Sequence, residues 1–120
     1  MNIEFCLKNI TNNTMITHSF KQDLNNNNYC FVYDNYDYKF DIRNNNKIIL
    51  NRTNIEHSMK MEFIENKNTL YTYKDFKKNI KISLNIYTNK IIYDKSIIVI
   101  LYSVLETNEN YEISLKRSNE

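Results

Sequence analysis

Apolar and polar residues alternate along most of this chain, and the alternation is the feature that most limits what the chain can fold into. Residues 36–42 carry Tyr, Phe or Ile at every second position with Asp or Lys between them, and residues 80–86 repeat the pattern with Ile and Leu. The segments 3–7, 59–63 and 111–115 do the same. A two-residue period is that of a β-strand with one buried face. No window of about 11 residues shows helical spacing, so the pattern predicts an all-β protein.

The turns must form without Gly or Pro, because the chain contains neither. Asn is the next residue able to adopt a positive φ, because its short amide can bond to the local backbone. Clusters containing Asn separate the alternating segments and predict breaks at 12–13, 25–28, 44–46, 66–68, 89–90 and 108–110. The resulting strands are 3–10, 14–20, 29–34, 36–43, 47–53, 57–65, 69–74, 79–88, 96–106 and 109–117. This spacing predicts one antiparallel up-and-down barrel of eight to ten strands, a single domain over residues 1–120.

Composition excludes several classes of function. A net charge of +2 indicates no strongly basic surface for nucleic acid, and a chain without Gly has no glycine-rich loop for phosphates or dinucleotides. The longest apolar run, residues 97–102, is too short to cross a bilayer, and the N-terminus carries no secretory signal. We therefore expect a soluble, cytoplasmic protein that does not associate with membranes.

The sequence shows no pattern of a catalytic or metal site. Cys6 and Cys30 form no CxxC motif, and in a reducing compartment both are expected to be free thiols. Two histidines cannot supply three or four metal ligands, and no spacing joins them to cysteines or acids. We expect a non-enzymatic protein with no cofactor and no metal.

Several short motifs follow one another between residues 36 and 117. They are Leu50-Asn51-Arg52-Thr53-Asn54, Met61-Glu62-Phe63, Asn66-Lys67, an aromatic strand with Tyr73, an alternating strand from Ile80 to Thr88, and a closing hairpin of 97–106 and 111–117. In this order they resemble the YwiB-like family of small bacterial β-barrels. The resemblance implies a calycin- or lipocalin-like barrel whose interior can hold a ligand. It implies no activity, because the family has none assigned.

The chain departs from the family pattern at its turns. Asn54 and Asn66 stand where the family tends to have Gly, which fits the use of Asn at positive φ. Residues 74–77, Lys-Asp-Phe-Lys, replace a Thr-Pro-Tyr-Gly-like turn of the family, so nothing that this turn binds is carried over.

Arg52 is the strongest candidate for a binding residue. It shares parity with Ile48 and Leu50, so it points into the barrel if they do. A buried guanidinium needs a carboxylate, carbonyl groups or an anionic ligand. Three interpretations remain open: a ligand anchor, a structural arginine that closes one end of the barrel, or the opposite register, in which Ile49 is buried and Arg52 faces water.

Two further residues complete the predicted ligand-binding set. His18 shares parity with Phe20 and so points to the interior, where a core histidine without a ligand is the alternative. Tyr73 lies in the aromatic strand of the family pattern. His57 falls in the region of a predicted turn and is expected at the surface.

The stretch 74–95 is locally basic, and Tyr and Phe lie in or beside it. Its lysines predict a polyanion-binding surface, formed by Lys74, Lys77, Lys78 and Lys81. The alternative is a solvated strand edge, where lysine prevents edge-to-edge aggregation. Lys, Tyr, Asn and Ile have A/T-rich codons, so a biased genome also explains their abundance.

Two functions from different classes follow as expectations. The first is a non-enzymatic barrel that binds a small anionic or amphipathic ligand through Arg52. The second is a nucleic-acid or protein interaction module that uses residues 74–95. Residues 97–101 are apolar on both parities, so the strand 96–106 is either covered on both faces or forms a contact, for example in a homodimer. An inward Arg52 beside a cavity favours the first function, and a filled interior with a continuous positive surface favours the second.

Overall fold

The protein is an all-β barrel. The computed structural model describes residues 1–22, 28–44 and 46–118. Within those ranges the chain forms ten strands: β1 (Asn2–Asn9), β2 (Thr14–Lys21), β3 (Asn28–Tyr33), β4 (Tyr36–Asn44), β5 (Lys47–Thr53), β6 (His57–Ile64), β7 (Asn68–Asp75), β8 (Ile80–Tyr93), β9 (Ile97–Val104) and β10 (Glu109–Ser118). No helix of the described chain is long and apolar enough to cross a membrane. The breaks predicted at 25–28 and 44–46 include residues 25–27 and 45, which lie outside the described residues.

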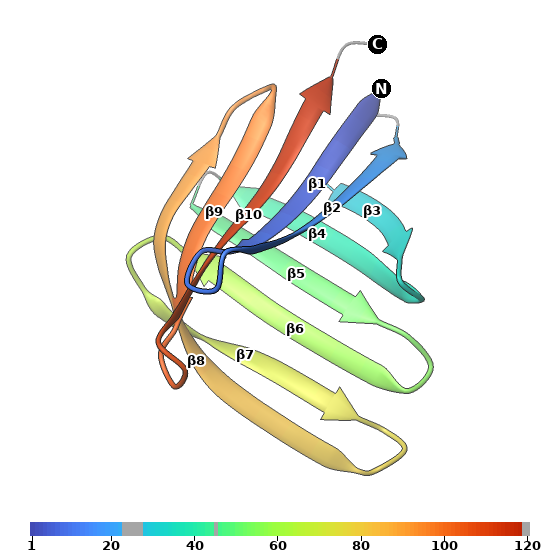
Figure 1. The fold of residues 1–120 in the computed structure, drawn as a ribbon, viewed down its shortest axis with the longest axis vertical. Helices are drawn as coiled ribbons and strands as arrows, with labels where there is room; N and C mark the ends of the chain where they lie inside the picture. Colours follow the sequence, from blue (N-terminus) through green and yellow to red (C-terminus); the bar gives the residue numbers. More distant parts are fainter. Residues whose placement is uncertain (23–27, 45, 119–120) are drawn as a thin grey trace.

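The ten strands form one antiparallel sheet in the order β2-β1-β10-β9-β8-β7-β6-β5-β4-β3. Every strand neighbours its successor in the chain except β2 and β3, and the pairing of β1 with β10 joins the two ends of the chain. The sheet curls on itself (Figure 1). As a result Phe5 of β1 meets Phe40 of β4 across the interior, with ring centroids 5.9 Å apart. The predicted antiparallel barrel is confirmed, with ten strands in a nearly closed ring.

Side chains close the seam between β2 and β3. The Phe20 ring stacks on Phe31 at 4.6 Å, and His18 approaches Tyr33 at 5.1 Å. The Gln22 side-chain amide donates to the Asn28 carbonyl oxygen over 2.6 Å, and its oxygen accepts the Cys30 N–H over 2.9 Å. This amide satisfies two backbone groups that a paired strand would otherwise satisfy.

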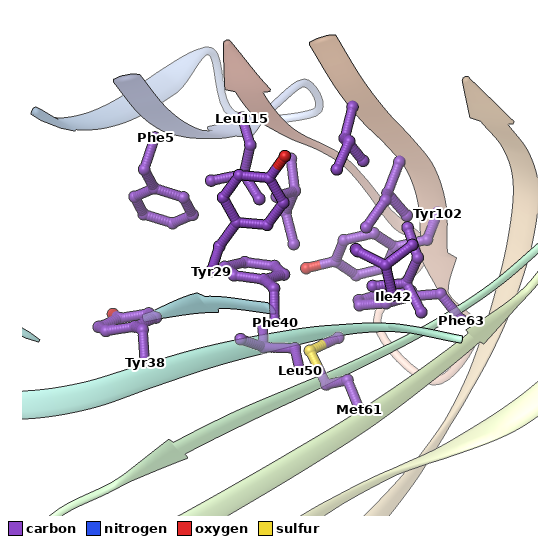
Figure 2. Close-up of a cluster of buried hydrophobic side chains, with 14 of the residues drawn as sticks. Phe5, Tyr29, Tyr38, Phe40, Ile42, Leu50, Met61, Phe63, Tyr102 and Leu115 are labelled. Atoms are coloured by element: carbon purple, nitrogen blue, oxygen red, sulfur yellow. The ribbon is translucent and has the colours of Figure 1, made fainter. Parts of the chain in front are cut away.

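The core is built from the inward parity of nearly every strand. Figure 2 shows Phe5, Phe40, Leu50, Met61 and other side chains converging on the interior from opposite walls. Phe5 is 1% exposed and Phe40 is fully buried. Burial of each such side chain stabilises the fold by about 1.5–3 kcal/mol, so a strand with a clear alternation favours the register that buries its apolar parity.

Asparagine forms the tight turns, as the sequence predicts. Asn13, Asn66 and Asn108 have φ of 56°, 61° and 55°. Asp34 and Asn35 both have positive φ, and they form the two-residue connection between β3 and β4. Two consecutive positive φ angles match the twist of a hairpin, which is why Asp and Asn serve here without Gly.

The break predicted at residues 89–90 is wrong. β8 continues to Tyr93, and its register to β9 shifts between Thr88 and Lys90. Asn89 therefore lies in a β-bulge, where an extra residue interrupts the alternation without ending the strand. The Glu65 carboxylate accepts the Ile91 N–H over 2.9 Å and so holds the backbone just after the bulge.

Candidate ligand-binding site

The register of β5 directs Arg52 into the barrel. Ile48 and Leu50 are 0% and 3% exposed in the core, and Arg52 follows at the same parity. Ile49 faces the other way and is nevertheless 9% exposed, since neighbouring strands shield it on the outer face. Arg52 therefore lies on the inner face of the barrel, at the end where β5 finishes.

Within the described residues, Arg52 contacts an aromatic ring and not the expected carboxylate or carbonyl partner. The guanidinium carbon lies 4.6 Å from the centroid of the Tyr36 ring, a cation–π contact. Among the described residues, Arg52 makes no ion pair, and its buried Nε has no hydrogen-bond partner. An unsatisfied buried donor costs about 1–3 kcal/mol, so this arginine is held by an aromatic face rather than by a matching charge.

Arg52 lines a cavity of about 280 Å³ inside this end of the barrel. The cavity wall is mostly apolar and includes Phe5, Leu50, Met59 and Met61. Its size is just below the range of about 300–1,000 Å³ that is usual for small-molecule sites. The cavity therefore suits a compact ligand with an apolar body.

Besides Tyr38, three tyrosines line the same cavity: Tyr71, Tyr102 and Tyr111. Burial raises the pKa of each phenol, most strongly that of Tyr102, and the neighbouring Glu109 further raises the pKa of Tyr111. The three phenols thus stay protonated at neutral pH. Tyr111 donates its hydrogen to Glu109, so the hydroxyls of Tyr71 and Tyr102 are the ones available as donors to a ligand.

A carboxylate, Glu109, also lines the cavity. Its Oε2 accepts hydrogen bonds from the side-chain amides of Asn9 and Asn12, over 3.0 and 3.1 Å, and its Oε1 accepts one from the Tyr111 hydroxyl over 3.2 Å. The bond from Asn9 and a further one from Thr107 hold the pKa of Glu109 below its usual range. Glu109 is therefore negatively charged at neutral pH.

At the mouth of the barrel, His57 links Tyr36 to Asp75. The imidazole Nε2 lies 3.3 Å from Asp75 Oδ2, and Nδ1 lies 3.0 Å from the Tyr36 hydroxyl. With Nε2–H donated to the carboxylate, Nδ1 accepts the Tyr36 hydroxyl hydrogen. Asp75 is itself fixed, because its Oδ1 accepts the N–H groups of Lys77 and Lys78. These bonds, first that from Lys78 and then the attraction of His57, lower the pKa of Asp75.

The expectation that His57 lies at the surface is wrong. The side chains of His57 and Asp75 are 22% and 11% exposed. His57 occupies the inward parity at the start of β6, two residues before the buried Met59. The alternation that continues to Met59 could have predicted an inward His57. The neighbouring turn at Asn54 led to the surface prediction instead.

The three predicted ligand-binding residues do not lie together in the structure. Tyr73 lies near Arg52 at the barrel mouth, stacked on His57 at 5.7 Å, and it does not line the cavity. His18 lies at the seam, where its ring meets Phe31 and Tyr33 at 5.6 and 5.1 Å. Of the three, Arg52 alone lines the cavity, and His18 has the packing role that was its alternative.

A second arginine, Arg117, also points inward and was not predicted from the sequence. Arg117 follows Ile113 and Leu115 at the inward parity of β10 and lies at the end of that strand opposite to Glu109. Its Nη2 donates to the Tyr29 hydroxyl over 2.8 Å. Arg117 is thus held near one end of the barrel by a hydrogen bond to a buried tyrosine.

The predicted polyanion surface lies on the hairpin of β7 and β8, which extends away from the rest of the barrel (Figure 1). Lys74, Lys77, Lys78 and Lys81 are all exposed. Lys74 pairs directly with Lys81 across the two strands. Beside them Phe76 is 57% exposed.

Three other features of the sequence are the two cysteines, the potential metal ligands and the apolar segment 97–101. Cys6 and Cys30 are free, and burial together with Glu112 and Glu4 raises the pKa of the Cys6 thiol, which disfavours a reactive thiolate. No group of three metal-ligating side chains occurs in the described ranges. On β9, outward Ile97, Val99 and Leu101 are half-buried beside the side chains of neighbouring strands.

Comparison with known proteins supports the fold and nothing finer. No family model and no curated protein matches the chain. The crystal structure of the YwiB protein from Bacillus subtilis is similar, with a TM-score of 0.64, over 98% of this chain and 89% of that one at 15% sequence identity. The resemblance to YwiB-like barrels is therefore confirmed at the level of the fold.

Proposed function

We propose that this barrel binds a small amphipathic anion in its cavity and that Arg52 anchors the anionic group. The observation that carries the proposal is the buried Arg52 Nε, which has no hydrogen-bond partner among the described residues and belongs to a cavity-lining side chain. Buried donors are satisfied in most proteins, and an exception calls for an explanation. A carboxylate or similar group at Arg52 supplies that partner.

The chemistry of the wall supports this class of ligand. Guanidinium presents five donors in a planar fork that matches carboxylate and phosphate oxygens. The protonated hydroxyls of Tyr71 and Tyr102 add neutral donors, and Met59 and Met61 supply apolar contacts. The ligand thus needs an anionic group and a compact apolar body.

The comparison of the two inward arginines argues against a purely structural role for Arg52. Arg117 donates to the Tyr29 hydroxyl and lies near the other end of the barrel. Arg52 has no such donor contact within the described chain. A fold that needed Arg52 for its own stability would be expected to satisfy this donor, as it does for Arg117.

The methionines allow a direct test. Met59 and Met61 line the cavity, whereas Met1 and Met15 are 49% and 64% exposed. In protein labelled with ¹³C at the methionine methyl groups, titration with para-toluate is expected to shift Met59 and Met61 and leave Met1 and Met15 in place. The neutral analogue para-toluamide is expected to bind more weakly.

Variants separate the anchor from general apolar binding. Hydrogen bonds to a charged group contribute about 1.5–3 kcal/mol, so Arg52→Leu is expected to weaken para-toluate by about 10-fold or more. Arg117→Leu is the matched control and is expected to leave the affinity unchanged. Equal binding of toluate and toluamide, or equal loss in both variants, would contradict the proposal.

A second function rests on the lysines of the β7–β8 hairpin. Like charges directly opposite each other destabilise a strand pair, and an anionic partner would relieve the repulsion between Lys74 and Lys81. Exposed Phe76 offers a stacking surface beside them. Fluorescence anisotropy with labelled oligothymidine tests this function, and salt-dependent binding that Lys74→Gln with Lys81→Gln abolishes would support it.

A further inference from the structure

Arg52 and Glu109 lie on opposite walls of the cavity. Arg52 is on β5 and Glu109 is on β10. In one direction around the barrel β6 to β9 separate these strands, and in the other β1 to β4 separate them. The two charged side chains line the same cavity and make no ion pair with each other.

The charge of Glu109 is not neutralised within the described chain. Its hydrogen-bond partners, Asn9, Asn12, Thr107 and Tyr111, are neutral donors, and no cation within the described ranges forms an ion pair with it. Such donors orient a carboxylate and favour its ionised form, but they add no positive charge. Glu109 therefore presents a negative charge to the cavity.

Aromatic rings stand beside this carboxylate. Tyr111 donates to Glu109 and stacks on Tyr102, with ring centroids 5.2 Å apart and planes 11° from parallel. Tyr71, Tyr38 and Phe5 are further aromatic residues of the wall. Tyrosine faces attract organic cations, and a carboxylate next to them strengthens the attraction.

Resting on the proposed function, we infer that the ligand of this cavity is a zwitterion, with its anionic group at Arg52 and a cationic ammonium or similar group at Glu109. A simple anion satisfies Arg52 and is repelled by Glu109. A simple cation is attracted by Glu109 and repelled by Arg52. A compact molecule that carries one charge at each end of an apolar body complements both walls at once.

Three probes built on the same para-substituted benzene ring test this charge pattern. Para-aminomethylbenzoate is the zwitterion, para-toluate carries the negative charge alone, and para-methylbenzylamine carries the positive charge alone. Each is titrated into the full chain, with the methyl signals of Met59 and Met61 as the readout. The zwitterion is expected to bind about 10-fold more tightly than either singly charged probe, because one added ion pair in a partly shielded site is worth about that factor.

Variants of Glu109 assign the cationic end. Glu109→Gln is expected to remove the advantage of the zwitterion over para-toluate and to leave para-toluate bound as tightly or more tightly. Glu112→Gln is the matched control, because Glu112 lies on the same strand and does not line the cavity. Should Glu109→Gln fail to fold, the ranking of the three probes on the unaltered protein decides the question.

The outcomes separate this inference from the proposed function. Binding of para-toluate with no gain for the zwitterion overturns the inference and leaves the anion site standing. An advantage that persists in Glu109→Gln also overturns it. If none of the three probes shifts Met59 or Met61, both proposals fall.

Discussion

Replacement of the two inward arginines with leucine is expected to have different consequences for stability. For Arg52→Leu two effects oppose each other. The change removes the cation–π contact with Tyr36, a loss of about 0.5–2 kcal/mol. It also removes the buried Nε that lacks a partner, a gain of about 1–3 kcal/mol. The free energy of unfolding should therefore change by less than about 1 kcal/mol or increase.

For Arg117→Leu the expected effects all lower the free energy of unfolding. The variant loses the hydrogen bond from Nη2 to the Tyr29 hydroxyl, and Tyr29 is 4% exposed. A hydrogen bond to a charged group contributes about 1.5–3 kcal/mol, and its loss leaves a shielded hydroxyl without its partner. We expect the free energy of unfolding to fall by about 2 kcal/mol.

Urea denaturation of both variants and the unaltered protein measures the difference. The chain has no Trp and ten Tyr, so far-UV circular dichroism and tyrosine fluorescence are the two probes. Coincident transitions with equal m values permit the comparison of free energies. A loss of about 3 kcal/mol or more in Arg52→Leu is typical of a broken buried ion pair. That result would refute the reasoning that Arg52 is available to a ligand.

Three further predictions concern turns, pH and the seam. Asn66 has φ of 61°, so Asn66→Ala should lower the free energy of unfolding by about 1–2 kcal/mol while Asn66→Gly should be nearly neutral; equal thermal midpoints for the two would contradict this role. The pKa values of Asp75, Asp94 and Glu109 are lowered in the fold, so their contribution to stability is complete above the unfolded pKa, about 4, and is lost as the pH falls through the folded values. Denaturation curves between neutral and acidic pH should show this decline, with a shallower slope in Asp75→Asn. Phe31 stacks on Phe20 across the seam, so Phe31→Ala should cost about 3–5 kcal/mol and speed amide exchange in β2 relative to β9; uniform exchange would show that the seam is not the weak point.

The strands and most of the turns could be predicted from local information. Most strands bury alternate residues, and in β5 a slip of one position would turn Ile48 and Leu50 outward and Asn51 inward. Positive φ selects Asn in the absence of Gly, which marks turns at Asn13 and Asn108. The turn predicted at Asn89 was wrong because a bulge and a turn both interrupt the alternation. Only the pairing with the partner strand distinguishes a bulge from a turn.

The candidate site depended on contacts between distant segments. Parity linked Arg52 to Ile48 and Leu50 but left the opposite register open, and it could not show that Tyr36 lies under the guanidinium. The same parity applies to Arg117 and Glu109, whose partners Tyr29 and Asn9 are about a hundred residues away in the chain.

The sequence by itself determined which residues share a face within a strand, because side-chain direction in a strand follows from the local two-residue period. It also determined that Asn would form the turns. The tertiary structure alone decided that β1 pairs with β10, that the seam falls between β2 and β3, and which end of the barrel holds the cavity. Ring closure brings β5 and β10 to opposite walls, and thereby sets a guanidinium against a carboxylate across one space. Local periodicity carries no information on such pairing, since any strand with one apolar face can occupy any place in the ring.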